Sequence, residues 1–226
     1  MHFEQLVTTV ADGSVDVQGL TPELDQDLMY RLMKMAPACA DVEDHYFPAY
    51  TCLCIKNRFI VGRSFLENTE KTQTNYIIGS GDQLPNFKNN PALFAFIANA
   101  EGLLHDKRKD CPKLPVLDFE HGASRFAPVF ENDAVAELAK MTLETIEKSE
   151  RVAVLGIKNP FRFLVPLYNM LPNDRRSQLS CSVNSSLQPK DDQLELFVFP
   201  STSRTLLEKL EAANINTISL RDLAKV

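Results

Sequence analysis

The stretch that decides the fold of the C-terminal half is residues 171–186, which read LPNDRRSQLSCSVNSS. Apolar side chains recur at helical spacing up to this stretch, and Pro172 interrupts that pattern. Leu179, Cys181 and Val183 then alternate with polar residues, as in a strand that buries one of its faces. The stretch therefore predicts the junction of a helix with a buried strand. It lacks the Gly-x-Ser-x-Gly pattern of a nucleophile loop.

Two arginines, Arg175 and Arg176, lie between that helix and that strand. Cations near the C-terminal end of a helix interact favourably with its dipole, so a solvated link is the first interpretation. An anion site at the same place is the alternative. Arg175 and Arg176 are therefore the candidate binding residues of the chain.

Outward from this junction, helical and strand patterns alternate from about residue 126 onwards. The patterns predict helices at 132–149, 159–170 and 203–213 and strands at 152–157, 180–183, 194–199 and 215–220. Such alternation is typical of a small layered α/β unit.

The preceding residues contain more strand-like runs than helical ones. We expect strands at 3–10, 46–55, 58–65 and 75–78, and helices at 21–35 and 90–104. Thr21-Pro22 is expected to begin the first helix, and Lys56-Asn57 to form the turn of a hairpin. The fold class is therefore predicted to be α+β. A mainly β subdomain with helices, 1–125, precedes the α/β subdomain, 126–226.

Composition restricts the kinds of function that suit the chain. With 226 residues and 44% hydrophobic content it can bury an ordinary core, and its net charge of −6 makes nucleic acid an unlikely partner. Five cysteines in a chain of this length favour a reducing compartment. No apolar run approaches the roughly 20 residues of a membrane helix. We therefore expect a cytoplasmic protein without membrane contact.

Two sets of residues are candidates for a metal site and a nucleotide site, but their spacing argues against both. Cys39, His45, Cys52 and Cys54 could supply four zinc ligands, but they lack the paired Cys-x-x-Cys spacing of structural zinc sites. Gly79-Ser80-Gly81 lacks the lysine and spacing of a phosphate-binding loop. The expectation is packed thiols, with no metal and no cofactor.

A catalytic interpretation has to combine residues that are distant in the sequence. Cys181, His121 and Asp118 are the candidates for a nucleophile, a general base and its carboxylate partner in a hydrolase or transferase. Free cysteine is among the most frequently buried residue types, so a packed Cys181 is favoured over a catalytic thiol. The sequence leaves both readings open.

Several segments together resemble a known family. The family is that of bacterial GTPase-associated proteins of predicted conflict systems. Its N-terminal domain is similar to residues 4–6, 19–24, 50–55, 59–65 and 74–76. Its middle domain is similar to residues 152–200. Because the sequence shows no complete catalytic constellation, we expect a non-enzymatic adaptor or regulatory module that binds a protein partner. The resemblance implies that this partner belongs to a GTPase system.

Overall fold

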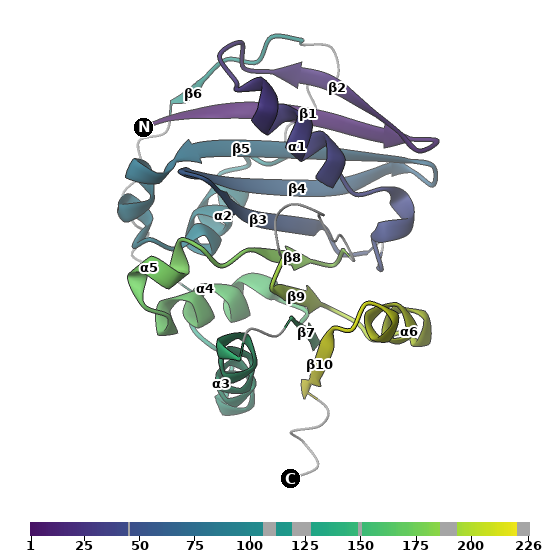
Figure 1. Cartoon of the computed structure of the whole chain (residues 1–226), viewed down its shortest axis with the longest axis vertical. Coiled ribbons are helices and arrows are strands. Elements are labelled where there is room, and N and C mark those ends of the chain that lie inside the picture. Colours follow the sequence, from purple (N-terminus) through teal and green to yellow (C-terminus); the bar gives the residue numbers. More distant parts are fainter. Residues whose placement is uncertain (45, 106–111, 119–127, 149–150, 186–193, 221–226) are drawn as a thin grey trace.

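The computed structural model of the chain describes residues 1–44, 46–105, 112–118, 128–148, 151–185 and 194–220. Within these residues, ten strands form one mixed sheet (Figure 1). The strand order is β10-β7-β9-β8-β3-β4-β5-β1-β2, and β6 pairs with β1. The sheet confirms the predicted α+β class.

The N-terminal half of the sheet is antiparallel. Its strands are β1 (His2–Ala11), β2 (Ser14–Leu20), β3 (Ala49–Ile55), β4 (Arg58–Asn68), β5 (Lys71–Ser80) and β6 (Leu117–Asp118). The β3–β4 hairpin turns at Lys56-Asn57, with Ile55 opposite Arg58, as predicted. The sequence pattern did not predict β2 or β6.

The C-terminal half of the sheet is parallel. Its strands are β7 (Val152–Leu155), β8 (Cys181–Val183), β9 (Leu196–Phe199) and β10 (Asn216–Ser219), and its helices are α3 (Asp133–Glu147), α4 (Pro160–Met170), α5 (Asn173–Arg176) and α6 (Arg204–Ala212). All four strands belong to the common sheet, which confirms the predicted α/β unit. The short helix α5 was not predicted.

The two halves meet where β3 pairs with β8. This pairing is antiparallel, and it places Cys52 directly opposite Cys181. The sheet therefore runs on from one half into the other. The boundary that the sequence predicts at residues 125 and 126 lies outside the described residues.

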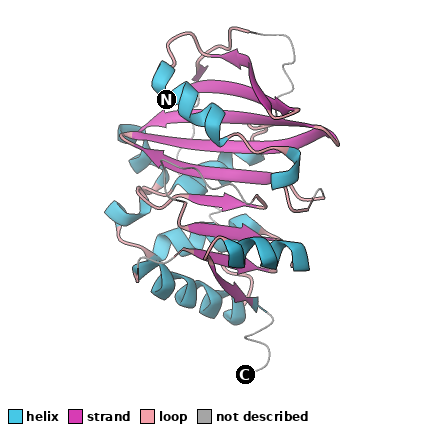
Figure 2. Ribbon diagram, turned by 45° about the vertical axis from the view of Figure 1, so that its right-hand side comes forward, coloured by secondary structure: helices cyan, strands magenta, loops and turns pink. Residues whose placement is uncertain are grey.

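Helices cover both faces of the sheet. One face packs against α2 (Pro91–Ala100), α3 and α4, and the other packs against α1 (Gln26–Met35) and α6 (Figure 2). Strand residues alternate between the two cores, since Cys52 lies in the first and Leu53 in the second. Two 3-10 helices, η1 (Cys39–Asp41) and η2 (Gly81–Phe87), connect these elements.

The N-terminal caps of two helices agree with the prediction from sequence, and that of a third does not. The side chains of Asn90 and Asn132 cap α2 and α3 as the sequence predicts, each accepting a backbone N–H bond at 3.0 Å. The prediction for α1 is wrong, because that helix begins at Gln26 and is capped by Asp25. The Thr21 hydroxyl instead accepts the backbone N–H of Gln5 at 2.9 Å. A sheet contact thus outcompetes the local helix signal.

Candidate functional site

The connections of the parallel strands diverge at two neighbours, β7 and β9. From β7 the chain enters α4, which packs on one face of the sheet, and from β9 it enters α6, which packs on the other. In open α/β sheets, ligands bind outside the carboxyl ends of strands at such a switch point. The ends of β7 and β9 are therefore the first place to look for a site.

A hollow of about 170 Å³ lies at this point, and we call it the switch-point hollow. Its walls are mostly aromatic side chains and prolines. They come from the ends of β7, β8 and β9, from β3 and the residues before it, from α2 and from the start of α4. The lining residues are Phe47, Pro48, Tyr50, Asn99, Ile157, Lys158, Pro160, Phe161, Val183, Asn184 and Pro200. The rings of Tyr50 and Phe161 meet edge to face with centroids 4.9 Å apart.

The tyrosine in this hollow is held by a hydrogen bond and by a nearby charge. The Tyr50 hydroxyl donates to the side-chain oxygen of Asn99 at 2.8 Å, and the Arg63 guanidinium lies 5.9 Å from the centre of the Tyr50 ring. Burial raises the pKa of Tyr50 above its ordinary value, although the positive charge of Arg63 acts against the rise. Tyr50 therefore remains a neutral phenol at neutral pH and does not supply a general base.

A buried asparagine joins the hollow to the loop beside it. Asn184, at the end of β8, has a positive φ of 54°, a conformation that asparagine adopts more readily than most residues. Its side-chain nitrogen donates to the carbonyl oxygens of Asp44 and Phe47, each at 2.7 Å. Its side-chain oxygen is buried and has no hydrogen-bond partner in the described part of the chain. Asn184 thus fixes one wall and leaves an unused acceptor within it.

One exposed residue lines the same hollow, and a second is adjacent in sequence to a lining residue. Lys158 follows β7 and also lines a neighbouring hollow of about 260 Å³. Tyr46 precedes Phe47 and is 94% exposed. Exposed aromatic residues beside an apolar hollow are common in surfaces that bind other proteins.

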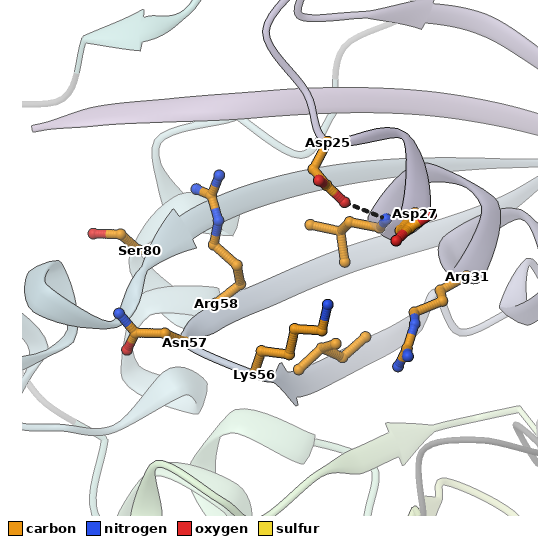
Figure 3. Close-up of a pocket in the computed structure, with 9 residues that line it drawn as sticks. Asp25, Asp27, Arg31, Lys56, Asn57, Arg58 and Ser80 are labelled. Carbon is orange, nitrogen blue, oxygen red and sulfur yellow. Dashed lines mark hydrogen bonds between the residues drawn. The ribbon is translucent and has the colours of Figure 1, made fainter.

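A second hollow, of about 300 Å³, lies at the other end of β3, and we call it the hairpin hollow (Figure 3). It lies between the turn of the β3–β4 hairpin and the first turns of α1. The lining residues are Asp25, Asp27, Leu28, Arg31, Ile55, Lys56, Asn57, Arg58 and Ser80. Most of them are charged or polar, in contrast to the switch-point hollow.

The predicted helix–strand junction is present, but its arginines are not on a solvated link. Leu179, Cys181 and Val183 lie in the core with α4, as expected. Arg175 forms an ion pair with Glu195. Arg176 donates to the carbonyl oxygens of Leu171 at 2.8 Å, Asn169 at 2.7 Å and Lys88 at 3.2 Å. Both side chains are half-buried, and Arg176 bonds to the end of α4. The predicted solvated link is therefore wrong, because both arginines make contacts that stabilise the fold.

The structure separates two of the three candidate catalytic residues. Cys181 is fully buried in β8, whereas Asp118 lies in β6 and pairs with His2. Four strands, β3, β4, β5 and β1, lie between β8 and β6. At about 4.8 Å per strand, this separates Cys181 and Asp118 by roughly 24 Å. His121 lies outside the described residues.

The cysteines considered for zinc occupy different surroundings. Cys52 and Cys54 share a face of β3, and burial raises the pKa of Cys54 to about 12. The sulfur of Cys39 accepts a hydrogen bond from Thr72 at 3.1 Å, and His45 is outside the described residues. Among the residues that are described, no three His, Cys, Asp or Glu side chains group so as to hold a metal ion.

Sequence reasoning considered one lining residue, Ser80, in the disfavoured phosphate loop, and it did not single out the residues of either hollow together as a site. The switch-point hollow brings together segments that are about 150 residues apart, such as Phe47 and Pro200, and local patterns do not show this. One signal was available, because Lys158 and Pro200 each follow a predicted buried strand closely. Residues in that position line ligand sites in open α/β sheets.

Comparisons with known proteins identify no family and no relative for this chain: no protein-family model matches it, and no curated protein matches it. The structure adds that no helix in its described part is both long enough and apolar enough to cross a membrane. The site has to be interpreted from its own geometry.

Proposed function

We propose that the protein is a non-enzymatic adaptor or regulatory module that binds a protein partner. In this proposal, the switch-point hollow receives one apolar or aromatic side chain of that partner. The resemblance to GTPase-associated proteins favours a component of a bacterial GTPase system as the partner, in the cytoplasm.

The size of the hollow is the observation that carries this proposal. Pockets for drug-sized ligands usually measure about 300–1,000 Å³, whereas this hollow measures about 170 Å³. Such a volume suits an anchoring side chain better than a whole cofactor. Aromatic anchors in well-packed pockets contribute most of the binding energy in many protein interfaces.

The chemistry of the lining supports binding rather than catalysis. Among the described residues that line this hollow, Lys158 alone carries a charge at neutral pH. Tyr50 is neutral there, and Asn99 and Asn184 are amides that hold other groups in place. None of these residues forms a nucleophile paired with a base. The alternative enzyme built on Cys181 and Asp118 has no geometric support.

Peptide selection tests the proposal without knowledge of the partner. Random peptides would be selected on the immobilised chain, and enriched peptides should share an aromatic or large aliphatic anchor. Their affinity, measured by fluorescence anisotropy, should fall at least about tenfold in Phe47→Ala, because that change removes a wall of the hollow. A GTPase encoded beside this gene, if there is one, should show the same loss.

The control is Tyr30→Ala, which removes an aromatic side chain, 56% exposed, from α1 and outside the hollow. This variant should bind the selected peptides like the unmodified chain. Equal affinity of the unmodified chain and Phe47→Ala would contradict the proposal. So would enriched peptides without an apolar anchor.

A further inference from the structure

The hairpin hollow gathers cationic side chains from three segments of a chain whose net charge is −6. Arg31 comes from α1, Lys56 from the hairpin turn and Arg58 from the start of β4. In Figure 3, Lys56 lies between the two arginines and directs its amine toward the first turn of α1. Cations from separate segments around a hollow are a common feature of sites for anionic groups.

The charged residues of this hollow differ in the hydrogen bonds and ion pairs that they already form within the protein. Arg58 pairs with Glu4 at 2.7 Å, and the Asp25 carboxylate accepts the backbone N–H of Leu28 at 2.8 Å. Lys56 has neither a hydrogen bond nor an ion pair with any of the described residues. The amine of Lys56 is therefore the group that remains available to a ligand.

The backbone at Lys56 is in a conformation that lysine rarely adopts. Its φ is 54°, in the left-handed region that favours glycine or asparagine. The turn is fixed there, because Gly81 donates its N–H to the carbonyl oxygen of Asn57 at 2.7 Å. A Cβ on Gly81 would lie only 2.1 Å from the side-chain oxygen of Asn57. Two-residue hairpin loops require positive φ, so the turn itself fixes the backbone that carries Lys56.

The rest of the lining indicates what kind of molecule fits. Leu28 and Ile55, both buried, provide an apolar floor. Asp27, on the first turn of α1, lies at the opposite side of the hollow from Arg58 (Figure 3). A carboxylate there repels a second anionic group and favours a neutral or positive one.

We propose that the hairpin hollow binds a small organic anion, a carboxylate or a phosphate monoester, whose other end is neutral or positive. Lys56 and Arg58 contact the anionic group, and Asp27 faces the opposite end. The volume of about 300 Å³ is at the lower limit for small-molecule sites, so the ligand is compact. The site is independent of the switch-point hollow, and neither proposal depends on the other.

Titration of the full chain with defined probes tests this site. The probes are phosphoethanolamine, β-alanine and inorganic phosphate, followed by NMR at constant ionic strength. Phosphoethanolamine or β-alanine should give saturable shifts of the amides of Lys56, Asn57 and Ser80, and should bind more tightly than inorganic phosphate. The two organic probes together show whether phosphate or carboxylate is preferred.

Two variants and one control give the test its specificity. Lys56→Gln should weaken binding of the preferred probe at least about tenfold while the denaturation midpoint stays unchanged. Asp27→Asn should reduce the preference for that probe over inorganic phosphate. Lys34→Gln, in the last turn of α1 and outside the hollow, should bind like the unmodified chain.

Three outcomes would overturn the site. They are the absence of saturable shifts, shifts spread over exposed lysines at large, and an affinity that Lys56→Gln leaves intact.

Discussion

The two hollows lie at opposite ends of one strand, β3, and are built in opposite ways. β3 has 7 residues, so its ends are roughly 20 Å apart at about 3.4 Å per residue. The lining of the switch-point end includes buried side chains with fixed hydrogen-bond partners, such as Asn184 and Tyr50. The hairpin end is lined by charged side chains, of which Lys56 has no polar partner among the described residues.

This difference indicates how function and stability are coupled in each region. At the switch-point end, the residues that shape the site also hold the fold together, so substitutions there should lower stability. At the hairpin end, a substitution can remove binding while stability stays constant or rises. Each of the following predictions tests that contrast.

The largest effect is expected for Asn184→Ala. The change leaves the carbonyl oxygens of Asp44 and Phe47 without their donor and places alanine at positive φ. We expect a loss of about 3 kcal/mol in the free energy of unfolding, measured by urea denaturation. Asn184→Gly should lose about 1 kcal/mol less, because glycine tolerates this backbone. A neutral Asn184→Ala would show that the wall does not depend on this residue.

The next effect separates two neighbouring arginines. Arg176→Ala removes three hydrogen bonds to main-chain carbonyl oxygens and should cost about 1.5 kcal/mol. Arg175→Ala removes a partly exposed ion pair with Glu195 and should cost less than about 1 kcal/mol. Denaturation of both variants under one set of conditions decides the order. The reverse order would contradict the role of Arg176 at the end of α4.

A smaller effect, which depends on pH, is expected for Tyr50→Phe. Loss of the hydrogen bond to Asn99 should cost about 1 kcal/mol at neutral pH. The fold raises the pKa of Tyr50, so the unfolded chain releases this proton first as pH rises above about 10. Stability therefore falls between the unfolded and the folded pKa, and Tyr50→Phe should make that fall less steep. An unchanged alkaline slope would show that Tyr50 is not protected by burial.

The smallest effect has the opposite sign and belongs to the hairpin end. Lys56→Asn places at this positive φ a residue that tolerates it better, and should raise the free energy of unfolding by about 0.5 kcal/mol. Lys56→Gln keeps the strain and should leave stability unchanged within about 0.3 kcal/mol. Thermal or urea unfolding of the pair measures the difference. A destabilised Lys56→Asn would mean that Lys56 stabilises the turn.

Local patterns predicted the elements well where a single segment determines them. Asn90 and Asn132 cap helices as expected, and the residues around Cys181 form a strand. The same patterns failed at Thr21, where pairing with Gln5 outweighs a helix signal. The polar edge strand β2 was also missed, because it buries little apolar surface.

The candidate site could not be predicted from local sequence patterns, because contacts between distant segments form it. The switch-point hollow requires β8 to pair with both β3 and β9, contacts that join distant segments. The sequence patterns also did not show that both faces of β8 are buried. Ser182, on the face opposite Cys181, is fully buried and donates to the carbonyl oxygen of Ser185. Only the strand order shows that the ends of β7 and β9 lie side by side.

The central claim is that a partner places an apolar side chain in the switch-point hollow. An NMR structure of the chain with the tightest selected peptide tests it most directly. The account predicts nuclear Overhauser contacts between the anchor of the peptide and the rings of Phe47 and Phe161. Contacts confined to the hairpin hollow, or to another surface, would contradict it.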